Sequence, residues 1–485
     1  MNILKRPMFF AAVTSALTAV ISLYFFKTAF VFLALAAVLI LFVATKYKFE
    51  YFSVFIAVLI FGISLFGEYQ KIEKIKISDG AKVKSEFIVL EEPIKSDKFN
   101  RFTAKALKGG DLPKGSKYVL FDYDKTDVSS GDIINAVIRV TAIKSADEYR
   151  LYDYGNSVYA SGSVLSAKST GKTNKFYKFC ANIREYVTAK SNSVFDKNTV
   201  GFLIALTIGD KSQLSDKFLN NVKTTGISHI IVVSGMHLSI ILSSVFLLLD
   251  KLFYNKYVRS ALSLAFVILI SGVCGFTMSV TRAGVMFVIM ALAPLFSREN
   301  DSLSSLCTAV VGVLISAPFA VVNVSFLLSV MSTLAIIWAV PFYTSLVKQK
   351  LKISSKAVEI LLNIVFCSVF AMIFTLPITV KIFGFISVVA PLTNLLVTYP
   401  VMLALICNVA AMLLSVIPVL NILSYPLFSV ANYSARFIIF VVNKMADLPI
   451  TVAVLPKSFI VFSLALIALI IAYMYIYDLK KKRSV

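Results

Sequence analysis

The chain has 485 residues, of which 58% are apolar and only 15% are charged. An ordinary soluble domain carries about 25% charged residues. A soluble core has no use for so much apolar surface, whereas a bilayer accommodates it as the apolar solvent around the protein. The composition therefore excludes a soluble globular protein and predicts an α-helical polytopic membrane protein.

The net charge of +22 suggests, at first sight, a protein that binds nucleic acid. The longest polar stretch, residues 68–190, contains 22 basic and 16 acidic residues and so contributes only +6. The remaining charge lies mostly in short loops between apolar segments, which is the pattern that retention of Lys and Arg in the cytoplasm produces. Most of the charge therefore indicates membrane topology, and the excess on the polar stretch suggests an anionic partner without identifying it.

Three apolar segments open the chain, at Phe9–Phe26, Phe30–Ala44 and Tyr51–Phe66. No small-residue cleavage site follows the first of them, so it does not have the pattern of a cleaved signal peptide. Basic residues precede the first segment and lie between the second and third, which places the N-terminus in the cytoplasm. Residues 1–67 are thus predicted to form a three-helix membrane segment that brings the chain to the outer face.

Residues 68–170 have the pattern of β-structure outside the membrane. Polarity alternates along several short stretches, as expected of half-buried strands, and turns rich in Gly, Ser and Asp separate them. Five short strands in about a hundred residues suit a small closed barrel such as an OB-fold, and a small sandwich fits the periodicity almost as well. The predicted strands are Lys82–Leu90, Asn100–Leu107, Lys117–Tyr123, Asp132–Ile143 and Ser157–Leu165.

Residues 171–195 are predicted to form an amphipathic helix. Apolar side chains fall on one face, whereas Lys175, Lys178, Arg184 and Lys190 fall elsewhere. This distribution is typical of a helix that lies in the outer membrane–water interface. The apolar face comprises Phe176, Phe179, Cys180, Ile183, Tyr186, Val187 and Val194.

A second membrane portion, residues 196–478, is predicted as the transmembrane core, followed by a basic cytoplasmic tail at 479–485. A short apolar run, Gly201–Ile208, and a short polar helix, Gln213–Lys223, precede nine apolar segments, which raises the total to about twelve. Basic residues favour every second loop, which also places the β domain outside and both termini in the cytoplasm. The nine segments are Ile230–Leu249, Ala261–Phe276, Ala283–Phe296, Ser304–Val322, Phe326–Leu346, Ala357–Phe383, Val388–Ile417, Leu420–Val442 and Phe459–Tyr477.

Both histidines of the chain lie in one short block that begins at Gly226. His229 and His237 are eight residues apart and so lie about two helical turns apart on one face. Ionisable groups at membrane depth usually face a cavity or a partner, which favours a functional role over simple helix packing. Ser234 and Gly235 permit close packing or a local break. Two histidines lack the further ligands that zinc needs, and no cysteine pair has zinc-site spacing, so we expect no metal or other cofactor.

Three further ionisable residues are candidates for a pathway through the membrane. Arg282 begins an apolar segment and either reaches the outer interface or contacts an anion in a water-filled path. Asp210 lies where a broken helix could line such a path. Asp301 belongs to a polar turn that we expect in the cytoplasm.

Several motifs resemble the ComEC family of competence membrane proteins. The most specific is the block with Ser-His229 followed by Ser234-Gly235-Met-His237, and the turn Gly209-Asp210-Lys-Ser precedes it. The resemblance spans nearly the whole chain in the family's order. The supporting motifs are Leu151-Tyr-Asp-Tyr154, Arg282-Ala283, Arg298-x-x-Asp301 and Phe326-Leu-Leu-Ser329 after Pro318.

This resemblance implies a channel in the cell (cytoplasmic) membrane that imports single-stranded DNA during natural transformation. The outer OB-like domain would receive the strand and the helical core would conduct it. Implied partners are single-stranded DNA, membrane lipids, a DNA receptor and a cytoplasmic helicase or translocase, and a homo-oligomer is compatible with this. The implied channel motif comprises Asp210, His229, Ser234, Gly235, His237, Arg282 and Asp301.

Many members of the ComEC family carry a C-terminal metallo-β-lactamase-like domain that would act as a nuclease. This sequence has no His-x-His-x-Asp-His cluster. We therefore expect no enzymatic activity, with any strand degradation supplied by another protein.

An OB surface follows a strand by charge and by stacking bases on aromatic rings. Any single aromatic candidate is more simply explained as part of the barrel core. Two other functions stay open: a transporter or envelope-assembly protein for another anionic polymer or lipid, and a membrane-embedded metal-dependent hydrolase using the two histidines. The candidates for DNA binding are Arg101, Phe102, Lys105, Lys117, Tyr118, Phe121 and Tyr123.

Overall fold

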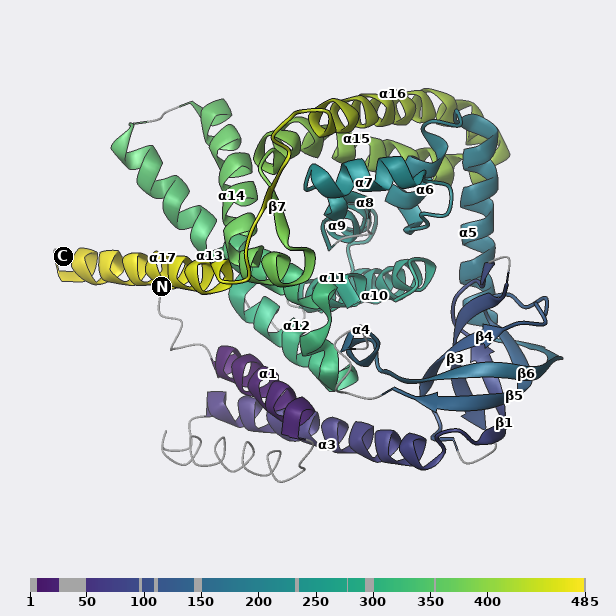
Figure 1. The fold of residues 1–485 in the computed structure, drawn as a ribbon. Helices are drawn as coiled ribbons and strands as arrows, with labels where there is room; N and C mark the ends of the chain where they lie inside the picture. Colours follow the sequence, from purple (N-terminus) through teal and green to yellow (C-terminus); the bar gives the residue numbers. More distant parts are fainter. Residues whose placement is uncertain are drawn as a thin grey trace.

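The computed structural model describes residues 7–25, 49–95, 98–108, 112–143, 151–231, 235–276, 278–292, 301–352 and 355–483. These residues are mostly helical, and a six-stranded sheet interrupts the helices between α3 (Phe49–Ile77) and α5 (Lys175–Val194) (Figure 1). The predicted division into a helical membrane protein with an inserted β-structure is confirmed at this level. The predicted segment at 30–44 lies outside the described residues.

The sheet is built from strands whose bounds agree closely with the alternation of polarity. Each of the five long strands pairs with two others, in the ring β1–β5–β6–β4–β3–β1, and β2 adds to β3. All pairings are antiparallel except β4 with β6. The strands are β1 (Lys82–Val89), β2 (Ile94–Lys95), β3 (Asn100–Lys108), β4 (Lys117–Asp122), β5 (Asp132–Ala142) and β6 (Val158–Thr173).

Alternate side chains of these strands fill the interior of the sheet, because successive residues of a strand point to opposite faces. Phe87, Tyr118, Leu120, Ile134 and Ile138 are fully or almost fully buried there. The rings of Phe87 and Tyr118 meet edge to face at 5.8 Å. This core fixes which residues of β3 and β4 face outwards.

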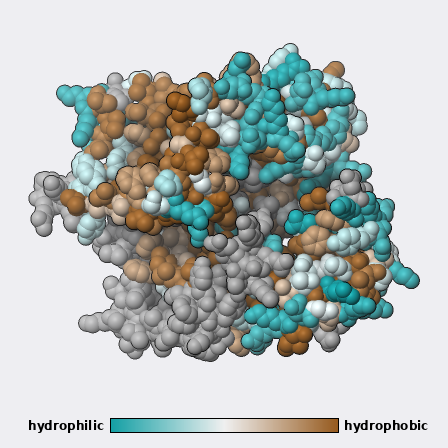
Figure 2. All heavy atoms as spheres, viewed as in Figure 1, coloured by the Kyte–Doolittle hydropathy of each residue, from teal (hydrophilic) through white to brown (hydrophobic). Residues whose placement is uncertain are grey.

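Six described helical segments are long and apolar enough to cross a membrane, and three shorter helices are also apolar. Figure 2 shows apolar side chains gathered over the region of α14, whereas polar side chains cover α7 and much of the sheet. The helices in question are α1 (Pro7–Phe25), α10 (Lys256–Val273), α11 (Met278–Leu292), α12 (Ser302–Ser316), α13 (Val324–Lys350), α14 (Lys356–Phe383), α15 (Ala390–Val416), α16 (Asn421–Ala446) with the turn η5 (Pro418–Leu420), and α17 (Phe459–Arg483).

Shorter elements complete the core and connect it to the sheet. The helix α15 lies beside α16, and α6 packs against α15 close to the far end of α5 (Figure 1). The short strands β7 and β8 pair with each other just before α15 and just after α16. These elements are α4 (Leu151–Gly155), α6 (Val200–Ile208), α7 (Asp216–Thr224), α8 (Ser228–Ile231), α9 (Gly235–Leu252), η4 (Pro318–Val322), β7 (Phe385–Ser387) and β8 (Val452–Val454).

The helix α5 runs from the sheet to α6 and turns most of its apolar face to the protein. Cys180 and Val187 are buried there, in the same cluster as α6. Phe179 and Tyr186, predicted on the same face, are 54% and 38% exposed. These two aromatic residues are the exposed members of the predicted apolar face.

Two contacts of α5 bring together helix ends that the predicted alternation of crossings places on opposite faces. Arg184 donates a hydrogen bond of 3.3 Å to the carbonyl of Val273 at the end of α10, and Tyr186 shares one of 2.7 Å with the hydroxyl of Ser415 at the end of α15. Arg184 and Tyr186 lie about 3 Å apart along α5. The ends of α10 and α15 therefore contact the same turn of α5.

Candidate functional site

The helix α6 is too short to cross a membrane. Its nine residues extend about 13.5 Å at 1.5 Å per residue, against a hydrocarbon core of about 30 Å. All of them but Thr207 are buried. The chain then turns at Asp210, whose side chain accepts a hydrogen bond of 2.9 Å from the backbone N–H of Ser212. Asp210 thus holds the turn after a half-helix, the position predicted for a broken helix.

The loop between α7 and α8 packs directly on the start of α15. Gly226 has a φ of +77°, and a Cβ there would lie 2.5 Å from the Cβ of Ala390 and 2.9 Å from that of Ser387. Both the backbone conformation and the close approach require glycine. The block with the histidines is thereby fixed to a helix more than 150 residues further along the chain.

The two histidines lie close enough for their charges to interact. His237 on α9 is fully buried. His229 on α8 is exposed. Gly235 begins α9, and Ser234 lies outside the described residues. Among the residues that the structure describes, no three His, Cys, Asp or Glu side chains converge as metal ligands.

Arg282 is a buried cation on α11 with 4% of its surface exposed. Its Nη1 donates to the hydroxyl of Thr333 on α13 at 3.0 Å and approaches the sulfur of Met286 at 3.7 Å. Thr333 donates in turn to the carbonyl of Ser329 at 2.7 Å. Within the described residues, Arg282 Nε has no hydrogen-bond partner and no carboxylate pairs with the guanidinium. The described contacts of the guanidinium are therefore all with neutral groups.

Asp301, by contrast, has a structural contact. It is the N-cap of α12 and accepts a hydrogen bond of 3.0 Å from the backbone N–H of Ser304. Such a cap satisfies one of the free N–H groups at a helix start. This contact alone explains why an acidic residue stands there.

The outward face of β3 and β4 carries basic and aromatic side chains in register. Arg101 lies opposite Phe121, and Lys105 lies opposite Lys117. Burial lowers the pKa of Lys117 from its ordinary value. Tyr123, just after β4, is 57% exposed. This group of residues is called the β3–β4 face below.

Phe102 and Tyr118 do not belong to the β3–β4 face, which corrects their place among the candidates. Their exposures are 3% and 0%, because they alternate with Arg101 and Lys117 and so point into the sheet interior. One residue was missed: the ring of Phe99 lies 5.4 Å from that of Phe121 and 5.7 Å from that of Tyr123. Phe99 precedes Arg101 by two residues, so the alternation along β3 would have placed both side chains on the same outward side.

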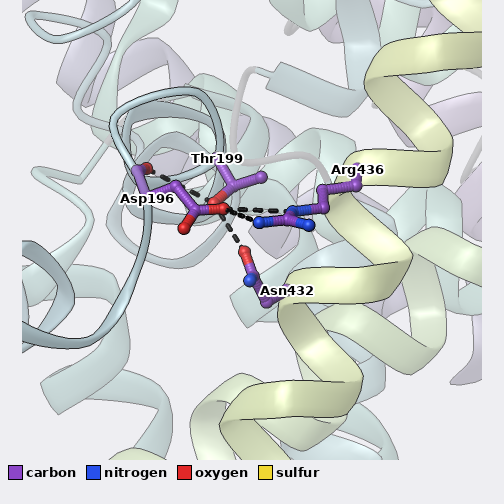
Figure 3. A network of polar contacts seen from close by, with 4 residues as sticks. All are labelled: Asp196, Thr199, Asn432 and Arg436. Carbon is purple, nitrogen blue, oxygen red and sulfur yellow. Dashed lines mark hydrogen bonds and ion pairs between the residues drawn. The ribbon is translucent and has the colours of Figure 1, made fainter.

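A polar network ties the start of α6 to α16 (Figure 3). Thr199, the N-cap of α6, donates 2.6 Å to the side-chain oxygen of Asn432, and Arg436 donates 3.0 Å from Nε to Asp196. A second bond runs from Arg436 Nη2 to the same oxygen, Oδ2 of Asp196, so two donors of the guanidinium share one acceptor. These partners are more than 230 residues apart, so sequence periodicity gives no sign of them.

The chain is similar to one protein family and to one curated protein. Residues 206–480, more than half of the chain, match the family model described as "Competence protein". The chain is 25% identical over 187 residues to "ComE operon protein 3" of Bacillus subtilis (strain 168), an alignment that covers 39% of this chain and 24% of that protein. No solved structure matches. The matched region includes Asp210, both histidines, Arg282 and Asp301.

Proposed function

Because this chain belongs to the competence protein family, we propose that it is a channel in the cell membrane that imports single-stranded DNA during natural transformation. The relative it matches is about four times as long as the aligned part, so the substrate is inferred from this chain's own residues. The observation that carries the proposal is the β3–β4 face, where Arg101 lies across from Phe121 and two further aromatic rings flank it. Aromatic stacking next to a positive charge is how proteins hold single strands without reading sequence.

The sheet domain is an OB-fold on the outer face of the membrane in this proposal. The ring β1–β3–β4–β6–β5–β1, with a single parallel pair between its third and fifth long strands, supports a five-stranded barrel of that kind. In OB-folds the second and third strands carry the nucleic-acid face, and here these are β3 and β4. The basic residues at the N-terminus and in the tail favour cytoplasmic termini.

The helical core conducts the strand past the half-helix α6, His229 and Arg282. An exposed His229 and a buried arginine without a described carboxylate partner suit a phosphodiester backbone. About twelve crossings fit the apolar segments. The interfacial position of α5 is supported by exposed Phe179 and Tyr186. A receptor would deliver the strand and a cytoplasmic translocase would pull it.

Binding of fluorescent single-stranded DNA to the full chain in lipid nanodiscs tests the proposal. We expect binding that weakens with salt and is reduced by Arg101→Ala. The matched control is Arg139→Ala, because Arg139 is an exposed arginine on β5 of the same sheet, paired with Lys82. A chain that does not bind single strands, or a deletion strain that transforms normally, would contradict the proposal.

A further inference from the structure

The small helix α4 packs against η4 and so connects the sheet domain to the helical core. Tyr154 and Tyr159 place their rings 6.0 and 6.2 Å from the ring of Phe319 on η4, and 5.2 Å from each other. All three rings are at most 1% exposed. Tyr154 also donates a hydrogen bond of 3.0 Å to the carbonyl of Ile143 at the end of β5. These contacts therefore join β5, β6 and η4 through one buried aromatic cluster.

At the end of α4 the two parts touch backbone to backbone. A Cβ on Gly155 would lie 2.8 Å from the Cβ and 2.9 Å from the backbone nitrogen of Asn323. Neither atom belongs to a flexible side-chain end, so a larger residue would separate the two surfaces. The contact is thus as close as two chain segments can come.

The side chain of Asn323 makes one hydrogen bond to the sheet domain and one within the helical core. Its Nδ2 donates a hydrogen bond of 2.9 Å to Oδ1 of Asn156, the residue after α4. Its Oδ1 accepts 3.1 Å from the backbone N–H of Phe326 and so caps α13. With 1% exposure, Asn323 has no room to take another rotamer at either contact. Any displacement of the sheet domain therefore acts directly on the first turn of α13.

The same helix holds the buried arginine. Thr333 lies ten residues after Asn323, about 15 Å along α13, and accepts the hydrogen bond of Arg282. We propose that Asn323 is a positioning residue that couples the sheet domain to Arg282 through α13, so that a strand held on the β3–β4 face and the arginine of the core move as one unit. We call the contacts of Asn323 with Gly155 and Asn156 the joint. The consequence for transport rests on the proposed function, whereas the joint does not.

Three aspartate variants separate the joint from the helix cap. Asn156→Asp keeps an acceptor for Nδ2 of Asn323. Asn323→Asp still caps α13, because Asp and Asn are equivalent caps, and it accepts from Asn156 once that amide turns over. The double variant places two carboxylates against each other without a donor, so it loses the joint while it keeps the cap. Only the double variant is expected to have a phenotype.

The joint is measured by electron paramagnetic resonance on the full chain in nanodiscs, with the five native cysteines replaced by alanine. Spin labels go on Lys168→Cys in β6 and Lys350→Cys at the end of α13, both exposed. We expect one narrow distance distribution for the wild type and both single variants, and a broad one for the double variant. A narrow distribution in the double variant overturns the joint. If the double variant does not fold, Gly155→Ala separates the same surfaces and must broaden the distribution.

The coupling is measured as strand transport into vesicles that contain the same variants. We expect the double variant to lose about fivefold or more in transport, within the range known for coupling between sites. Its affinity for the strand should change by less than about twofold, because Phe121 lies at the end of β4 away from the joint and distant sites act independently. A broad distance distribution with normal transport overturns the coupling. A wild-type chain that binds no strand overturns the proposed function instead, and the distances still decide the joint.

Discussion

Arg282 of α11 donates a hydrogen bond to the hydroxyl of Thr333 on α13, at 3.0 Å. This neutral partner holds the guanidinium in place without cancelling its charge. A buried arginine of this kind costs stability unless another anion compensates it. In the proposed channel, the phosphate groups of the strand would supply that anion.

The variant Arg282→Met tests this view, because methionine fills a similar apolar volume without charge. We expect strand transport to be lost, while the free energy of unfolding stays the same or rises by about 1–4 kcal/mol, as when buried ionic groups are replaced by apolar ones. Transport in vesicles and thermal unfolding in detergent measure the two effects. The control is Arg259→Met, where the arginine is half-buried and its ion-pair partner Asp250 is exposed, and such a surface pair is worth about 0–1 kcal/mol. Normal transport by Arg282→Met would remove the arginine from the pathway.

Phe121 and Tyr118 stand three residues apart on β4 and should respond in opposite ways to truncation. Phe121→Ala is expected to weaken single-strand binding by about 1–3 kcal/mol, the value of one stacked base, with a smaller effect on folding. Tyr118→Ala removes a fully buried ring and should cost about 3–5 kcal/mol of stability. Fluorescence anisotropy with labelled DNA and thermal melts distinguish the two. Equal losses of affinity at both positions would refute the assignment of the β3–β4 face.

The strands and long helices were predictable because each has its own periodicity. The alternation of polarity within Lys82–Leu90 sufficed to place β1. The strand β6 continues to Thr173 beyond the predicted Leu165, because its second half pairs with β5 through small polar residues that show no apolar alternation. The length of β6 therefore depends on its partner strand rather than on its own sequence.

The contacts that make the candidate site depend on tertiary structure and could not be predicted. Asp196 and Arg436 meet although 240 residues separate them. The alternation of crossings gave no sign that the ends of α10 and α15 both contact α5, because charge in loops indicates topology and not which helices pack together. Arg282 was predicted as an open choice between interface and pathway, and only the position of Thr333 favours the second.

Asp196 gives the chain a stability term that depends on pH. The hydrogen bonds from Arg436 hold the pKa of this carboxyl below its ordinary value of 3.8. A carboxyl with a lowered pKa stabilises the folded state above its unfolded pKa, and this contribution is lost as the pH falls through the folded value. We expect the wild type to melt at a higher temperature than Asp196→Asn at pH 6, and the two melting temperatures to converge as the pH falls through the lowered pKa of Asp196. A difference that persists in acid would assign the effect to packing.

Gly226→Ala tests whether the histidine block must pack on α15. The substitution meets two obstacles, a left-handed backbone with φ of +77° and a Cβ that would lie 2.5 Å from Ala390. The control is Gly384→Ala, where φ is +73° but nothing lies within 4 Å of the added Cβ. Both variants should lose about 1–2 kcal/mol from the backbone, and Gly226→Ala about 1–3 kcal/mol more from overpacking. Since the same shift would move His229, transport should fall in Gly226→Ala and persist in Gly384→Ala; equal behaviour of the two would show that the close approach to α15 has no functional role.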